Sequence, residues 1–172
     1  MPTVLIIAGP NGAGKTTFAN ALFAAEARGW PYLNADDIGR EAALADLPRA
    51  ERELRAGRLL LTKLDERVAE GADFGVETTL SSGLYARRIP AWKAHGYRVE
   101  LIYVRLPNVE ASIARVALRV ARGGHDVPEA DLRRRFDRSL RNLETLYKPL
   151  VDTWRVWDGR DGGAMLVERS PS

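Results

Sequence analysis

The sequence has no cysteine and only two histidines, His95 and His125. Without cysteine the chain forms neither a disulfide nor a thiolate metal site, which fits a reducing compartment. Two histidines are too few to indicate a histidine-based zinc site. A long apolar run and a signal-peptide pattern are also missing, because the apolar opening segment 3–8 has only the length of a strand. We therefore expect a cytoplasmic protein with no membrane partner.

The chain also lacks internal repeats, low-complexity segments and an evident linker. With 172 residues, 45% apolar residues and 28% charged residues, it has the composition of one globular domain over 1–172. Predicted strands lie near 3–8, 31–34, 73–78, 98–106, 154–158 and, more weakly, 164–168. Predicted helices lie near 15–28, 49–71, 84–95, 108–123 and 128–147. This alternation predicts an α/β fold with a mainly parallel sheet flanked by helices. Pro90 predicts a kink or break in its helix, and Gly123-Gly124 a hinge.

A glycine-rich turn joins the first predicted strand to the first predicted helix. Its pattern, Gly9, four residues and then Gly14-Lys15-Thr16, is a complete P-loop motif in the expected strand–turn–helix context. Backbone N–H groups of such a turn surround phosphate oxygens, Lys15 can reach the β- and γ-phosphates, and the Thr16 hydroxyl can ligate Mg²⁺. The predicted nucleotide-binding residues are Gly9, Pro10, Asn11, Gly12, Ala13, Gly14, Lys15, Thr16 and Thr17.

Polar residues follow the next two predicted strands, where ligands of parallel sheets bind. Asp36 and Asp37 end the first of them. We expect one of these acids to cap the following helix and the other, Asp36, to orient an acceptor hydroxyl and take its proton. Glu77 and Thr79 end the second strand. A carboxylate there is costly unless it is paired or faces a cleft, so we expect both residues to hydrogen-bond a substrate.

The fourth predicted strand ends in Arg105, Pro107 and Asn108, and so lacks the acidic residue that closes a Walker-B strand. Motor ATPases and GTPases hold their metal with such an Asp, so its absence favours a small-molecule kinase, in which the acid moves to a neighbouring strand.

Residues 115–141 contain eight arginines and four acidic residues. Arg115, Arg119 and Arg122 share one predicted helical face, and the latter two adjoin the hinge, where they would neutralise charge on the γ-phosphate. We expect Arg133, Arg134, Arg138 and Arg141 to form a solvated basic face. His125 is expected in a turn or against substrate. Nucleic-acid binding is disfavoured, because the segment's one aromatic residue, Phe136, has core spacing.

With these residues in place, the chain resembles the zeta-toxin family of P-loop kinases, particularly its short stand-alone members. The resemblance spans nearly the whole chain and rests on GPNGAGKTTFA, NADDIGRE, VETTLSS, YRVELIYVRLPNVEASIARVALRVARGGHDVPEADLRRRF and NLETLYKPLVDTWRVWD. It implies phosphorylation of a hydroxyl by ATP or GTP with Mg²⁺, and the best-known members act on UDP-N-acetylglucosamine. It also implies phosphate contacts by Lys15, a Mg²⁺ contact by Thr16, Asp36 as the base, substrate contacts by Glu77 and Thr79, a lid arginine at Arg119 or Arg122, and Asp158 near the nucleotide base.

The chain departs from this family at two points. Toxic members carry a second lid arginine before a Thr-Pro pair, and His125 stands near that place here. The C-terminal extension of the larger toxins is also missing. These departures leave the acceptor, toxicity and any antitoxin partner open.

We therefore expect a P-loop fold of the nucleoside-monophosphate-kinase type, with a helical lid near 109–135. It would transfer the γ-phosphoryl group to a small-molecule hydroxyl, with UDP-N-acetylglucosamine as one candidate. The expected catalytic residues are Lys15, Asp36, Arg119 and Arg122, and the expected substrate contacts are Asp36, Glu77, Thr79, Arg115 and His125. The alternatives are a kinase for another nucleotide, sugar or antibiotic, and a nucleic-acid-binding P-loop NTPase.

Overall fold

One six-stranded sheet forms the centre of the protein. The computed structural model describes residues 1–26, 28–124, 126–160 and 163–171. The strands follow the order β2-β3-β1-β4-β5-β6, in which the first five are parallel and β6 is antiparallel to β5. Their bounds are β1 (Thr3–Ala8), β2 (Tyr32–Leu33), β3 (Phe74–Thr78), β4 (Arg98–Arg105), β5 (Thr153–Arg160) and β6 (Gly163–Arg169). The predicted α/β fold with a mainly parallel sheet is confirmed.

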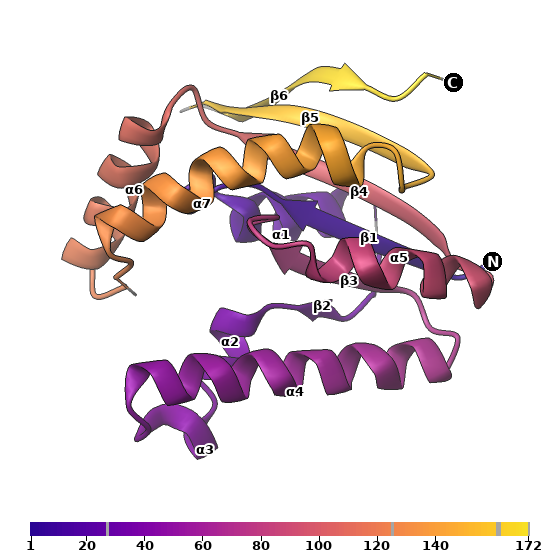
Figure 1. Ribbon diagram of the computed structural model, residues 1–172, viewed down its shortest axis with the longest axis horizontal. Helices are drawn as coiled ribbons and strands as arrows, with labels where there is room; N and C mark the ends of the chain where they lie inside the picture. The colour runs from indigo at the N-terminus through magenta and orange to yellow at the C-terminus, as the bar shows by residue number, and fades with distance from the viewer. Residues whose placement is uncertain (27, 125, 161–162, 172) are drawn as a thin grey trace.

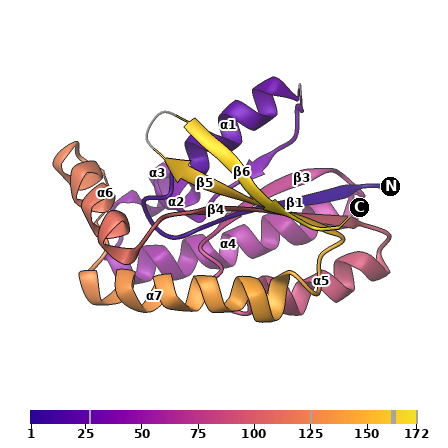
Figure 2. The ribbon, with the colours of Figure 1, turned by 90° about the horizontal axis from the view of Figure 1, so that it is seen from above.

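Helices cover both faces of this sheet, with α1 on one face and α4, α5 and α7 on the other (Figures 1 and 2). The central strand β1 is therefore buried on both sides, which explains its unbroken apolar run VLIIA with 0% exposure throughout. The helices are α1 (Lys15–Ala25), α2 (Ala35–Gly39), α3 (Ala42–Ala45), α4 (Arg49–Ala69), α5 (Leu84–Ala94), α6 (Val109–Ala121) and α7 (Glu129–Asn142), which continues as the π-helical turn η1 (Leu143–Tyr147).

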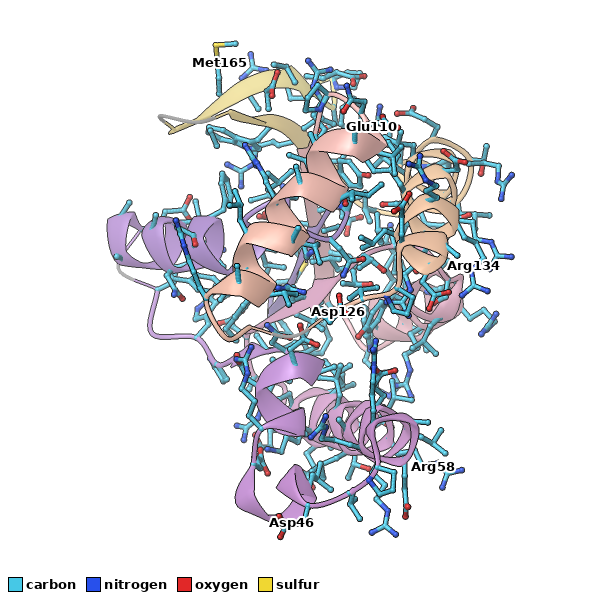
Figure 3. All side chains as sticks on the ribbon, turned by 90° about the vertical axis from the view of Figure 1, so that its left-hand side faces the viewer. Asp46, Arg58, Glu110, Asp126, Arg134 and Met165 are labelled. Carbon is cyan, nitrogen blue, oxygen red and sulfur yellow. The ribbon has the colours of Figure 1, made fainter. Side chains whose placement is uncertain are left out.

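The strand register brings the carboxyl ends of the parallel strands to one edge. Ala8, the last residue of β1, pairs with Thr78 of β3 on one side and with Tyr103 of β4 on the other. Helix α6 stands beyond this edge in Figure 1, and Figure 3 looks at the molecule from that side. Loops that follow β1, β2 and β3 therefore meet there, as a parallel sheet requires.

Two local expectations differ from the structure. Helix α5 continues through Pro90, so the expected break is absent, and the alternative of a kink stays a prediction. Ile89 and Trp92 next to it are buried under the sheet, and this packing offsets the backbone hydrogen bond that proline cannot donate. The short helices α2 and α3 lie in a segment where no helix was predicted, and both are too short to show a helical periodicity in the sequence. Within the described residues, no helix combines the length and apolarity that a bilayer crossing requires.

Candidate active site

The P-loop is held in place by its glycines and by α6. Gly9 has φ +149°, and a Cβ there would lie 2.3 Å from the Val104 carbonyl oxygen, so only glycine fits. From outside the loop, the buried Ser112 hydroxyl donates to the Asn11 carbonyl at 2.6 Å. Arg115 donates to the Gly159 carbonyl at 2.8 Å. The first half of the predicted 109–135 lid is thus tied to the nucleotide loop and to β5.

Lys15 opens α1 and is almost fully buried, with 7% exposure. Its Nζ donates to the Pro10 carbonyl at 3.2 Å and lies 3.8 Å from a Glu77 carboxylate oxygen. Burial lowers the pKa of Lys15, and the charges of Glu77 and Asp36 oppose this while that of Arg119 reinforces it. These four side chains are therefore close enough to act on one another electrostatically around the P-loop.

Glu77 organises the oxygen atoms next to the P-loop. Its Oε2 accepts hydrogen bonds from the Thr16 hydroxyl at 2.8 Å, the Tyr32 hydroxyl at 2.8 Å and the Asn34 amide at 3.2 Å. Burial and the Glu77 charge raise the pKa of Tyr32, so Tyr32 stays a donor. The parallel register places Ile7 beside Glu77 and so brings this carboxylate to the loop. A hydroxyl and a carboxylate oxygen are ligands that Mg²⁺ prefers, and the residues present fit that ion.

The Asp36 carboxylate is exposed and is not the cap of its helix. The side chain of Asn34 accepts the Asp36 backbone N–H at 2.9 Å, so Asn34 is the N-cap of α2. Asp37 instead pairs with Arg40 at 2.7 Å on the surface. The expectation that one of the two acids caps this helix is wrong, because the amide one residue before the helix already fills that role.

The segment between β3 and α5, residues 79–83, is held by side chains from α7 and η1 and is called the acceptor loop after the role proposed for it below. Ser139 donates to the Thr79 carbonyl at 2.5 Å, Asn142 to the Leu80 carbonyl at 2.7 Å, and Tyr147 to the Ser82 carbonyl at 2.8 Å. These bonds fix a strained backbone, since Leu80 is fully buried with φ +57°.

Two adjoining cavities open beside these elements. The inner pocket, of about 290 Å³, lies between the P-loop, the acceptor loop and α4. The outer pocket, of about 590 Å³, lies between α2, α4 and α7 and is also lined by Gly123, Gly124 and Val127. Both are lined by Asn11, Ala35, Asp36 and Arg135. The Asn11 side-chain oxygen is buried and has no hydrogen-bond partner among the described residues.

The inner pocket brings together much of the site expected from the sequence. It is lined by Asn11, Gly12, Lys15, Asp36, Glu77, Thr79 and Arg119 among others. The remaining P-loop residues form the turn around Lys15 and the first residues of α1, including Thr16 and Thr17.

Three other candidates lie outside this pocket. Arg115 braces the P-loop from outside through a contact with the Gly12 carbonyl at 3.5 Å, and Arg122 is exposed at the end of α6. Asp158 is buried on β5, 3.4 Å from Arg105. His125 falls outside the described residues.

Arg135 is the pocket residue that the sequence did not indicate. Its neighbours Arg133 and Arg134 lie on the surface and pair with Glu129 and Asp131, as a solvated basic face would. Arg135 is half-buried and lines both pockets. The sequence did contain an indication that Arg135 faces inward, because Ser139 and Asn142 follow it at i+4 and i+7 on the same face of α7.

Residues 4–144 match the AAA domain family, and the chain belongs to that family. Its structure is similar to one from the PezAT chromosomal toxin-antitoxin system of Streptococcus pneumoniae (TM-score 0.75, 18% identity, 98% of this chain and 72% of that one). It is also similar to AvrRxo1-ORF1:-ORF2 with ATP, with a TM-score of 0.74 and 20% identity over 98% of this chain and 58% of that one. A third similar structure is a sugar kinase from Janibacter sp. HTCC2649, with a TM-score of 0.56 and 23% identity over 94% of this chain and 87% of that one. The fold is thus that of the zeta-toxin-like P-loop kinases, as the sequence resemblance implied.

Proposed function

We propose that this AAA domain protein is a kinase that transfers the γ-phosphoryl group of ATP or GTP to a hydroxyl of a small molecule. The proposal rests on one observation: Lys15, at the phosphate-binding loop, and the Asp36 carboxylate line the same inner pocket. A hydroxyl bound in that pocket lies between the anchor of the nucleotide phosphates and a base that can take its proton.

Each side chain has a distinct task in this reaction. The P-loop N–H groups and Lys15 hold the phosphates, and Arg119 neutralises charge that develops on the transferred group. Asp36 accepts the proton of the attacking hydroxyl as the new O–P bond forms and the bond to the nucleoside diphosphate breaks. Thr16 and Glu77 would hold Mg²⁺, which supplies further positive charge to the phosphates.

The acceptor is the finer part of the proposal. The zeta-toxin resemblance supports UDP-N-acetylglucosamine, and the fold shared with a sugar kinase supports another sugar or small metabolite. The shared fold with a toxin-antitoxin component also makes an antitoxin a candidate partner.

The test is phosphate transfer from γ-labelled ATP with Mg²⁺ to a panel of nucleotide sugars, nucleotides, sugars, antibiotics and short RNAs, with Lys15→Ala as the control. Label on a small molecule that disappears with Lys15→Ala supports the proposal. Label on RNA, or release of free phosphate with every acceptor, overturns it.

A further inference from the structure

The outer pocket has no task in the transfer step itself. Asp36 and Arg135 stand at its boundary with the inner pocket, while Lys15 and Glu77 line the inner pocket alone. With about 590 Å³, the outer pocket has room for a large part of a metabolite-sized ligand. An acceptor whose hydroxyl lies at Asp36 would extend its remaining groups into this space.

The charges around the outer pocket are mostly neutralised by partners on the protein. Arg40 is paired with Asp37 at 2.7 Å, and the Glu53 carboxylate with Arg49 at 2.8 Å. Among the described residues, no carboxylate lies within ion-pair distance of Arg135, although Asp36 lines the same cavity.

Arg135 differs in its surroundings from the two arginines before it, which pair with carboxylates on the surface. Arg134 carries its guanidinium away from the molecule at the outer side of α7, where it pairs with Asp131 (Figure 3). Arg135 is half-buried instead, and α7 cannot easily turn it outward, because Ser139 and Asn142 on the same face bond the acceptor loop. A half-buried guanidinium facing a cavity is well suited to a planar, two-point contact with an oxyanion.

We propose that Arg135 binds a phosphate group of the acceptor in the outer pocket, and so selects phosphorylated acceptors over neutral ones. This inference rests on the proposed kinase function, because it places the acceptor hydroxyl at Asp36. It adds a binding site that lies outside the P-loop and is formed jointly by α7, α2, α4 and residues Gly123, Gly124 and Val127.

A binding measurement without turnover tests the site directly. The protein is first saturated with Mg²⁺ and the non-hydrolysable β,γ-imido analogue of ATP, so that the P-loop is filled. Inorganic phosphate is then titrated at constant ionic strength, its binding to each variant is measured by isothermal titration calorimetry, and the Arg135 side-chain NMR resonance is followed in the wild type and in Arg134→Ala. We expect saturable binding that weakens about tenfold or more in Arg135→Ala, as loss of a charge-assisted contact implies. Arg134→Ala is the matched control and should bind as the wild type does.

The outcomes separate this inference from the proposed function. If phosphate moves no Arg135 resonance, or if Arg135→Ala and Arg134→Ala bind phosphate equally, the phosphate site is refuted whether or not the enzyme transfers label. With the acceptor identified by the labelled-ATP panel, Arg135→Ala should raise the acceptor KM about tenfold and leave the KM for ATP unchanged. A lower kcat with an unchanged acceptor KM would instead assign Arg135 to the transferred phosphate, and would overturn the proposal.

Discussion

The proposed nucleotide side and the proposed acceptor side of this pocket are built in different ways. On the nucleotide side, one continuous segment, residues 9–16, supplies the phosphate loop, the lysine and the threonine hydroxyl. On the acceptor side, the pocket-lining residues come from separate elements, with Asp36 on α2, Thr79 after β3 and Arg135 on α7. The nucleotide site is therefore local in sequence, whereas the acceptor site exists only once the chain has folded.

On each side of the pocket, a buried serine of a neighbouring helix donates a hydrogen bond to a loop of the site. Ser112 on α6 donates to the Asn11 carbonyl of the P-loop, and Ser139 on α7 donates to the Thr79 carbonyl of the acceptor loop. Their exposures are 1% and 0%. Each side is thus held by one neighbouring helix, which makes it feasible to perturb the two sides separately.

The largest effect is expected from Lys15→Met, which removes the charge on the nucleotide side. Methionine matches the length of the buried lysine stem, so we expect the fold to persist. Transfer of label should fall by about three orders of magnitude, as for loss of a group that stabilises developing charge. Circular dichroism and transfer of label from ATP measure the two properties. Lys63→Met, at a surface lysine paired with Glu41, is the control and should leave transfer unchanged. Comparable losses in both variants would contradict the assignment.

On the acceptor side, Asp36→Asn should lower kcat about 10²-fold or more, the usual contribution of a general base. In the part of the chain that the structure describes, the exposed Asp36 side chain makes no hydrogen bond, so stability should stay near that of the wild type. Nucleotide binding, measured by calorimetry, should also persist. Asp37→Asn, which affects only the surface pair with Arg40, serves as the control. If Asp36→Asn transfers phosphate at the wild-type rate, Asp36 is not the base.

This contrast also explains what could be predicted from sequence. The P-loop and the order of the strands and longer helices were predictable, because glycine spacing and apolar periodicity act over neighbouring residues, whereas the short α2 and α3 were not. The bond between Glu77 and Thr16 depends on the register of β1 and β3 and could not be read from one segment. Arg135 is the last of three consecutive arginines. Which of the three faces the pocket depends on how α7 packs, and the sequence contains only an indication of it.

Replacing the two serines should separate the two sides kinetically. Ser112→Ala should raise the KM for ATP, and Ser139→Ala that for the acceptor, because each removes one hydrogen bond that supports the loop on its side. Each leaves a partly buried carbonyl without its donor and should cost about 1 kcal/mol of unfolding free energy, measured in urea. Each variant is the control for the other. If both variants raised the same KM, the two sides would not be independent.

The smallest expected effect is an alkaline loss of stability caused partly by Tyr103, whose hydroxyl lies 2.8 Å from that of Ser139 behind the acceptor loop. Burial raises the pKa of Tyr103 to about 12. In the unfolded chain a tyrosine has a pKa of about 10, so between pH 10 and 12 the unfolded state binds fewer protons than the native state. The free energy of unfolding should therefore fall as pH rises through this range, and below it Tyr103 should contribute no pH dependence.

At pH 11 this residue should account for about 1 kcal/mol of that loss. Urea unfolding at a series of pH values measures it, with Tyr103→Phe as the comparison. Phenylalanine keeps the ring packing but has no proton to lose, so its curve should be flatter than that of the wild type between pH 10 and 12. The other tyrosines remain in both proteins and their contribution cancels in the difference. Parallel curves would mean that Tyr103 ionises as easily in the native state as in the unfolded chain. The hydroxyl pair behind the acceptor loop would then not be shielded from water. The acceptor side would in that case lack a buried hydrogen-bonded support of the kind that Ser112 gives the nucleotide side.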